Sequence, residues 1–304
     1  MKKNNLIYSK ITFVFIIMYT STINLSFAQN PVNSSTTEIL KNTYIQITGS
    51  CNWAHIGGCV AARSGPGTSF SKEHRLRNGI VLKVSEKIEI DDANKSNYWY
   101  KVDFKNEKIN KIERVKTDWY VNAKYTKILK DVSPEVYNEN NQVQNDNKKI
   151  YINLKKQTLE AYDGDTLFMK TKISSGLTDS PTESGEYFIH YKTPSRYMQD
   201  SATSTKIFYT ATSTEILANG ENKISTSTKF YATSTKGIAN YKDYYDLPGV
   251  PFDMYFSEDG SAIHGSYWHN NFGRRHSHGC INLNLKDSEK LYSWSPVGIA
   301  VIIK

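Results

Sequence analysis

The stretch between Ala262 and Asn282 gathers the residue types that nucleophilic catalysis requires. It holds one cysteine, Cys280, with a histidine two positions before it, His278, and another sixteen positions before it, His264. A thiol attacks a carbonyl as the thiolate, and a free cysteine, with a pKa of about 8.5, is mostly protonated at neutral pH. A nearby imidazole can take that proton and later return it to a leaving amine. The stretch therefore predicts a cysteine nucleophile assisted by histidine.

The residues beside the cysteine suit an acyl transfer. Gly279 leaves room for a carbonyl to approach the sulfur, and the backbone N–H groups around Gly279 and Cys280 can hold the oxyanion that forms. Ser277 belongs to the same motif. Asn282 can orient the backbone of the motif through a hydrogen bond, and the same hydrogen bond could be purely structural.

Two further groups can tune the thiol and the base. No carboxylate partner for His264 is evident in the sequence, so the backbone carbonyl of Gly265 or of a nearby residue is expected to orient it. Arg274 and Arg275 can hold a substrate carboxylate or lower the thiol pKa. Two solvated loop arginines are an equally good interpretation.

Two other interpretations of the stretch are open. His276, His278 and Cys280 alternate, so an extended strand would put them on one face, where they and His264 could bind a metal. The flanking glycine and asparagine have no use in a zinc site, which favours the nucleophile and predicts no metal and no cofactor. The second alternative is a structural cysteine beside solvated histidines. It does not explain why the stretch holds four of the seven histidines.

The pattern resembles the signature of the L,D-transpeptidase catalytic domain, the cysteine enzymes that cross-link peptidoglycan. The match consists of His264, a loop, and Ser277-His-Gly-Cys-Ile-Asn282. The resemblance implies that Cys280 is the nucleophile, that His264 is the base and that His278 assists. Twelve residues separate His264 from Ser277, slightly fewer than is usual in the family.

The resemblance also implies a substrate and a reaction. An enzyme of this family cleaves the bond between the third-position diamino acid of a peptidoglycan stem and a terminal D-alanine, and passes the acyl group to an amine of another stem. Attack by water instead would make the enzyme a carboxypeptidase, and the sequence does not separate the two. A secreted cysteine endopeptidase is a further alternative, although such enzymes usually place the cysteine before the histidine. The third is a non-catalytic wall-binding protein with a vestigial thiol.

Length and composition are consistent with an exported two-domain protein. The 304 residues suffice for two modest domains, and 21 tyrosines favour β-structure. A net charge of +8 fits an anionic wall surface, though solubility alone would explain it, and no dense basic run suggests nucleic acid.

The amino terminus has the pattern of a signal peptide, residues 1–28. Three lysines accompany the apolar run Ile11–Tyr19, and Ser26-Phe27-Ala28 is a small-x-small cleavage site. An uncleaved anchor is the alternative, but polar residues after Tyr19 make a stable span a poor fit. We expect a polar tether over 29–43 and a periplasmic or wall-associated mature chain without a membrane segment.

Residues 44–131 are expected to form a small β-barrel. Their turns and strands resemble the bacterial Src-homology-3-like domain, whose members often bind wall peptides or glycans. The matching landmarks are Arg63-Ser-Gly-Pro-Gly67, Leu76-Arg-Asn-Gly79, Trp99-Tyr-Lys-Val102 and Trp119-Tyr-Val121. Core packing is the simplest role for the tryptophans and tyrosines.

The other two cysteines, Cys51 and Cys59, lie close enough in sequence to pair as a disulfide outside the cytoplasm. Zinc held by these two cysteines and His55 is the alternative, although it lacks an evident fourth ligand. This leaves Cys280 as the odd cysteine, as expected of a free reactive thiol.

A polar linker over 132–148 is expected to precede a catalytic domain over 149–304. Strand-like runs, a Ser-x-Gly at Ser174 and a Pro-Thr-x-x-Gly at Pro181 extend the transpeptidase resemblance over this region. A Thr/Ser-rich insertion at 199–240 contains short apolar runs that can form a hairpin, as a lid over Cys280 or as a passive surface feature. The fold class predicted is mainly β: a small barrel, then a β-sandwich with a short helix after the cysteine.

Overall fold

The computed structural model describes residues 34–49, 60–92, 95–104, 115–137, 147–199, 206–216, 222–232 and 246–304. These residues belong to one compact unit, Val32–Lys304. The predicted signal peptide lies outside the described residues. So do Cys51, His55 and Cys59, and with them the predicted disulfide and the zinc alternative.

The N-terminal region forms an antiparallel sheet of seven strands. In order across the sheet, these are β3 (Lys72–Leu76), β2 (Val60–Arg63), β6 (Tyr120–Asn122), β5 (Lys95–Val102), β4 (Val81–Asp92), β1 (Ser34–Ile47) and β7 (Thr126–Leu129), with a 3-10 turn, η1, at Ala123–Tyr125. Most of β4 alternates as a half-buried strand does, with Leu82, Val84, Ile88 and Ile90 buried. In β5 the neighbours Trp99 and Tyr100 are both buried.

The strand β1 begins within the stretch for which a tether was predicted. Ser34, residues 36–39 and Thr43 pair with β4, with a register shift between Ile39 and Thr43. The Thr36 hydroxyl donates a hydrogen bond of 3.0 Å to Glu89. In an exposed part of a sheet, the backbone N–H and C=O groups are paired between strands while the side chains can be polar. Such a strand leaves no apolar pattern in the sequence. The polar composition therefore concealed a strand.

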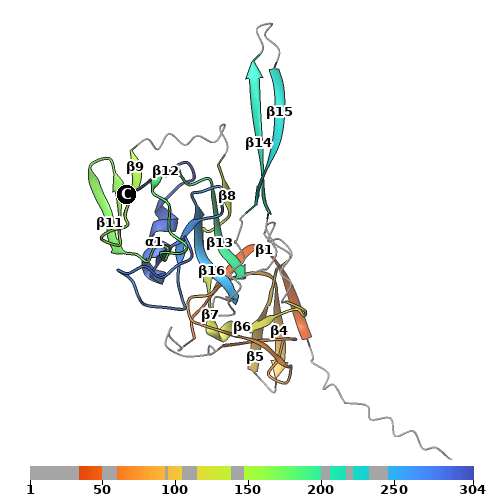
Figure 1. Ribbon diagram of the computed structural model, residues 1–304. Helices are drawn as coiled ribbons and strands as arrows, with labels where there is room; N and C mark the ends of the chain where they lie inside the picture. The colour runs from red at the N-terminus through yellow and green to blue at the C-terminus, as the bar shows by residue number, and fades with distance from the viewer. Residues whose placement is uncertain are drawn as a thin grey trace, which may run out of the picture. The chain divides into compact units, whose positions relative to one another are not determined.

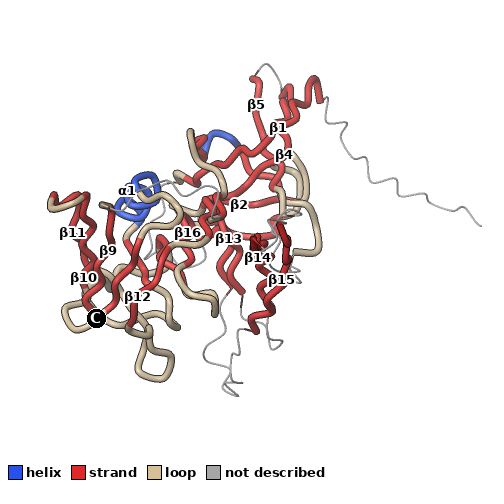
Figure 2. The backbone as a smooth tube through the Cα atoms, turned by 90° about the horizontal axis from the view of Figure 1, so that it is seen from above, coloured by secondary structure: helices blue, strands red, loops and turns tan. Residues whose placement is uncertain are grey.

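The C-terminal region contains two five-stranded sheets (Figures 1 and 2). The first has the order β11 (Thr166–Lys172), β10 (Thr158–Asp163), β9 (Lys148–Asn153), β19 (Ala300–Ile303) and β12 (Gly185–Phe188). The second has the order β18 (Ile281–Leu283), β17 (Ala262–Gly265), β16 (Asp246–Tyr255), β13 (Tyr191–Gln199) and β8 (Glu135–Val136). Pairing is antiparallel except between β19 and β9 and between β17 and β18.

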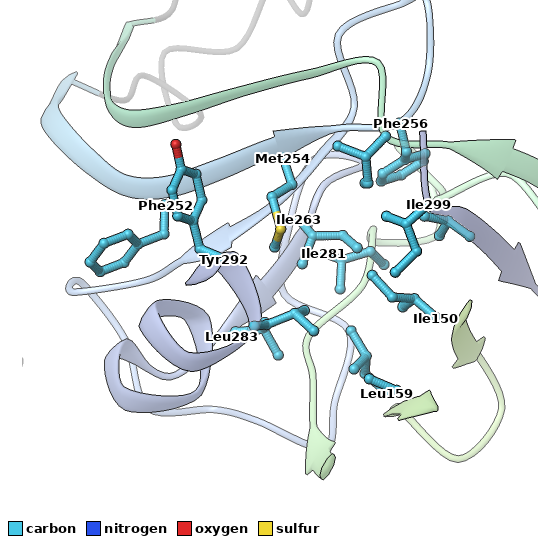
Figure 3. Close-up of a cluster of buried hydrophobic side chains, with 14 of the residues drawn as sticks. Ile150, Leu159, Phe252, Met254, Phe256, Ile263, Ile281, Leu283, Tyr292 and Ile299 are labelled. Atoms are coloured by element: carbon cyan, nitrogen blue, oxygen red, sulfur yellow. The ribbon is translucent and has the colours of Figure 1, made fainter. Parts of the chain in front are cut away.

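A buried apolar cluster joins these two sheets. Ile150 and Leu159 come from the first sheet, and Met254, Ile263 and Ile281 come from the second (Figure 3). All five side chains are buried. Because each lies on the inner face of its strand, the next residue along the strand faces away from this core. That alternation places His264 on the outer face of the second sheet.

The single α-helix of the described residues, α1 (Leu285–Trp294), follows β18 directly. The Asn284 side chain accepts a hydrogen bond of 2.9 Å from the Asp287 N–H, as an N-cap does. Leu291 and Tyr292 are buried in the sandwich core. A mainly β fold with a short helix after the cysteine is thus confirmed.

Two parts of the predicted connecting sequence also form strands. Within the stretch read as a linker, β8 pairs with β13, and Glu135 accepts a 3.0 Å hydrogen bond from the buried Lys192 ammonium. Within the insertion, β14 (Lys206–Ile216) and β15 (Asn222–Ala232) form one antiparallel hairpin (Figure 1). The apolar runs of the insertion belong to two long strands instead of several short ones.

A second buried cluster combines residues of the N-terminal sheet with three residues of the C-terminal region, Tyr197, Val250 and Tyr267. Tyr267 follows His264 by three positions, and its hydroxyl donates a 2.8 Å hydrogen bond to the Pro248 carbonyl. The loop after β17 is therefore anchored at its start. Across the described part of the chain, no helix is long and apolar enough to span a bilayer.

Candidate active site

His264 lies in a fully buried strand. The strand β17 lies between β16, which pairs with Ala262 and Ile263, and β18, which pairs with residues 263–265. All four of its residues are buried, and His264 is 2% exposed. Its Nδ1 atom is 3.1 Å from the Gly265 carbonyl oxygen. Since a carbonyl can only accept, Nδ1 carries the proton and Nε2 keeps its lone pair. This is the carbonyl that was expected to orient the ring.

Burial lowers the pKa of His264 to about 4, and the hydrogen bond to Gly265 opposes the shift. An imidazolium loses more solvation on burial than a neutral ring does, so the neutral form is favoured. At neutral pH the ring is therefore a neutral base with Nε2 available. Trp268 lies beside it, with ring centroids 5.8 Å apart.

Cys280 lies one position before β18, next to the strand of His264. In the parallel pair, Ile263 is opposite Ile281, and His264 is opposite Asn282. Continuing the register puts Cys280 opposite Ala262, and side chains two positions apart share a face. By this extrapolation Cys280, at the end of the turn before β18, is on the same face as His264, offset by about 5 Å across and about 7 Å along the sheet.

Cys280 is half-buried as a residue and has no disulfide partner. Burial of the sulfur raises the pKa of the thiol to about 12, with a smaller opposing effect from a hydrogen bond of the Ala262 backbone. The charges of Asp253 and Asp259 raise it further. With the pKa of His264 near 4, the resting pair at neutral pH is a thiol and a neutral imidazole.

The four residues Ser277 to Cys280 form a turn and not the extended strand that a shared metal-binding face would require. The Ser277 hydroxyl donates a 2.5 Å hydrogen bond to the Cys280 carbonyl and accepts one of 3.3 Å from the Gly279 N–H. Gly279 has φ +119°, a conformation open chiefly to glycine. The turn is thus specified by one hydroxyl and one glycine.

A second hydroxyl, from Thr182, holds the turn from outside. It donates 2.7 Å to the Gly279 carbonyl and accepts 2.9 Å from the Gly176 N–H. The Ser175 carbonyl accepts hydrogen bonds from the N–H groups of His276 and Ser277. The Ser-x-Gly and Pro-Thr segments seen in the sequence therefore support the cysteine turn, a role that was not assigned to them because they are distant in sequence.

The other predicted site residues are arranged around this turn. His278, Arg274 and Arg275 are exposed. The charges that act on the thiol pKa come from the two aspartates, and a substrate-binding role for the arginines stays a prediction. In the part of the chain that the structure describes, no three histidine, cysteine, aspartate or glutamate side chains are grouped as for a metal ion.

Asn282 has both backbone and side-chain contacts at the site. Its N–H and carbonyl exchange hydrogen bonds with Ser174, at 2.9 and 3.0 Å. Its side-chain amide lies 2.9 Å from His269, a residue for which the sequence suggested no role. His269 is buried in the loop between β17 and Ser277, and no apolar period marks it as buried.

A buried imidazole on one strand and a cysteine on the glycine turn that precedes the neighbouring strand are groups that could carry out acyl transfer. Residues 147–303 match the family model for the L,D-transpeptidase catalytic domain (YkuD), and the chain belongs to this family. The family resemblance inferred from the sequence is confirmed. No curated protein sequence matches the chain.

Several solved structures are similar to the chain at low identity. A cysteine-to-serine mutant of the Enterococcus faecium L,D-transpeptidase is 19% identical, with 52% of this chain and 50% of that chain covered and a TM-score of 0.37. The chain thus spans about half the length of that protein. An L,D-transpeptidase from Mycobacterium smegmatis is 13% identical, with 89% and 100% covered and a TM-score of 0.39. L,D-transpeptidase 3 from Mycobacterium tuberculosis is 14% identical, with 90% and 96% covered and a TM-score of 0.37.

Proposed function

We propose that this protein is an exported L,D-transpeptidase that cross-links or remodels peptidoglycan through a thioester on Cys280. The proposal rests on the family of residues 147–303 and, above all, on one observation. The parallel register of β17 and β18 puts His264 opposite Asn282, two positions after Cys280, and the Gly265 carbonyl leaves His264 Nε2 as the proposed base.

In the first step, the Cys280 sulfur attacks the carbonyl carbon of the third-position diamino acid of a tetrapeptide stem. Because the resting thiol is protonated, its proton moves to His264 Nε2 as the sulfur–carbon bond forms. The tetrahedral intermediate then expels the terminal D-alanine amine, which takes the proton back from the imidazolium. A thioester and free D-alanine result.

In the second step, the side-chain amine of another stem attacks the thioester carbonyl. The amine gives a proton to His264, the carbon–sulfur bond breaks, and the thiolate takes up that proton. The product is a new amide between two stems. If water attacks instead, the product is a trimmed stem, and the enzyme is a carboxypeptidase.

The oxyanion of each intermediate needs donors close to the sulfur. The Gly279 N–H is in a long hydrogen bond to Ser277, so we assign the first donor to the Cys280 N–H and the second to Gly279 after a small rotation of the turn. We expect His278 to assist from the exposed side of the turn, and Arg274 and Arg275 to bind a stem carboxylate.

Incubation with a disaccharide-tetrapeptide, followed by mass spectrometry, tests the proposal. Loss of D-alanine with dimer formation supports transfer, and loss of D-alanine without a dimer indicates a carboxypeptidase. Internal cleavage indicates an endopeptidase, and the absence of any product indicates a binding protein. Cys280→Ala should abolish every product at unchanged thermal stability, whereas activity in that variant would contradict the assigned nucleophile.

Two other regions have proposed roles in this reaction. The N-terminal sheet is proposed to be the wall-binding module, of Src-homology-3-like type, that was inferred from its landmark residues. The hairpin β14–β15 is proposed to act as a rim or lid of the site. Deleting 201–236 should then change substrate preference or turnover, and unaltered kinetics would leave the hairpin a passive surface feature.

A further inference from the structure

The loop between β17 and the cysteine turn contains a second buried histidine, His269, which is 5% exposed. Its Nδ1 accepts a 3.1 Å hydrogen bond from the Asn271 N–H. Its Nε2 lies 2.9 Å from the side-chain amide nitrogen of Asn282. The ring also contacts Phe272 and His276, with centroids 5.1 and 4.4 Å apart. The loop therefore closes on β18 through this ring.

The hydrogen-bond donors and acceptors around His269 permit one arrangement. A neutral imidazole has one donor nitrogen and one acceptor nitrogen. Because a backbone N–H can only donate, Nδ1 is the acceptor for Asn271, and Nε2 carries the proton. Nε2 then needs an acceptor, so Asn282 must present its amide oxygen to it and not its nitrogen.

The amide oxygen of Asn282 supports this arrangement. Asn282 is 2% exposed, and with its nitrogen toward His269 its Oδ1 is buried without a hydrogen-bond partner. The oxygen and nitrogen of an amide are assigned from the surrounding hydrogen bonds. Turning the amide gives the oxygen a donor in His269 and leaves the amide NH₂ group as the free hydrogen-bond donor of this side chain. In the register of β17 and β18, Asn282 lies directly opposite His264, so the two side chains share a face.

We propose that His269 is a positioning residue that donates its Nε2–H to Asn282, fixing the amide of Asn282 and holding the loop closed over His264. The proposal deepens the transpeptidase function and rests on it. The loop covers His264 through the Trp268 ring, whose centroid lies 5.8 Å from that of His264 and 6.0 Å from that of His269. The pKa of His269 is lowered to about 4 by burial and by the nearby His276 and His264, so the ring is neutral at physiological pH.

Two substitutions of His269 distinguish the hydrogen bond made by Nε2 from the one made by Nδ1. Glutamine places an amide donor near the position of Nε2, so His269→Gln can keep the contact to Asn282. Asparagine places an oxygen near the position of Nδ1, so His269→Asn can keep only the contact to Asn271. We expect His269→Gln to retain kcat within about threefold, and His269→Asn to lower kcat about 10- to 100-fold with little change in KM, within the range for misplaced catalytic groups.

A pH titration supplies a readout that a merely structural role would not move. In His269→Asn the opened loop admits water to His264, and its titration midpoint should rise from about 4 toward the ordinary value of 6.5. The midpoint is followed by NMR of the histidine ring protons, with His264→Gln used for assignment. His269→Gln should keep the low midpoint.

Combining His269→Asn with Asn282→Ala tests the pair directly. If the two residues act through one hydrogen bond, the double variant should lose no more kcat than the worse single variant. If the loss of kcat in the double variant equals the product of the two single losses, the residues act separately, and the proposal is overturned. Equal behaviour of the glutamine and asparagine variants would also overturn it. The NMR titration needs no substrate, so it tests His269 even if the wild-type chain fails to turn over a stem peptide.

Discussion

The two halves of the site are built in different ways. The half with His264 is a strand whose backbone is paired on both sides and whose four residues are buried. The half with Cys280 is a turn held by the hydroxyls of Ser277 and Thr182 and by the unusual backbone of Gly279. The proposed base is thus fixed by general sheet geometry, whereas the proposed nucleophile depends on a few specific side chains. Substitutions should separate these two kinds of support.

The largest effect is expected from removing the base on the strand side. His264→Gln should lower kcat about 10²- to 10⁴-fold, because proton transfer from the protonated thiol then has no acceptor. Steady-state release of D-alanine measures it. His74→Gln is the matched control, since it changes a partly buried histidine of the N-terminal sheet. Comparable activity in the two variants would remove His264 from the mechanism.

The next effect is expected from the hydroxyl that holds the turn from outside. Thr182→Val keeps the shape of the side chain but leaves the Gly176 N–H and the Gly279 carbonyl without their partner. Each unsatisfied buried group costs about 1–3 kcal/mol, so both the free energy of unfolding and kcat should fall. Thr182→Ser retains the hydroxyl and should stay close to wild type. Urea denaturation and turnover of both variants decide the matter, and an unaffected valine variant would show that the turn does not need this bond.

A smaller effect is expected from the backbone of the turn itself. Gly279→Ala places a side chain at φ +119° but brings the new Cβ no closer than 3.7 Å to its neighbours, so the cost is mainly backbone strain of about 1–3 kcal/mol. Gly164→Ala is the matched control, at φ +57° in open space far from the cysteine turn in sequence.

Both glycine variants should unfold at lower urea concentration, but only the Gly279 variant should lose activity. A variant that retains full activity with alanine at 279 would show that the turn tolerates another conformation.

The smallest effect on activity is expected from pH changes near neutrality. With pKa values of about 4 for His264 and about 12 for Cys280, kcat/KM should be nearly flat between pH 6 and 8. An inflection near 6.5 in the wild-type profile would contradict the buried neutral base.

Stability should respond to acid more strongly than activity does near neutrality. His190, His264 and His269 have pKa values lowered to about 4 by burial, below the ordinary value of 6.5. Between these values the unfolded chain binds protons that the folded chain does not, so stability is complete above pH 6.5 and falls as pH decreases toward 4. The slope approaches about 1.4 kcal/mol per pH unit for each histidine. Urea denaturation at several pH values measures it.

The contrast between strand and turn also explains what the sequence predicts well. Local sequence patterns are enough to predict the hairpin that contains His264 and the Asn284 cap of α1. In both cases the turn signal or the capping residue lies next to the element it specifies. The oriented His264 ring and the neighbouring carbonyl of Gly265 could be anticipated for the same reason.

Other features depend on which segments become neighbours in space. Nothing local indicates that Thr182 bonds to Gly279, that β18 pairs in parallel with β17, or that His269 is buried. The strand β3, Lys72–Leu76, has only one buried apolar residue, so its pattern is too weak to predict it. These elements form because segments distant in sequence make hydrogen bonds to their backbone groups. The periodicity of the local sequence does not indicate which segments those are.

The hydroxyl of Thr182 has a consequence for how the chain acquires its reactive centre. It joins two segments 97 residues apart, whereas hairpins such as β10–β11 close over a few residues. Long closures are entropically costlier and slower than short ones. A nascent chain should therefore possess much of its β-structure while its sulfur is still outside its final turn. Until that closure, the Cys280 thiol is an ordinary thiol, open to oxidants and without the turn that the proposed reaction needs.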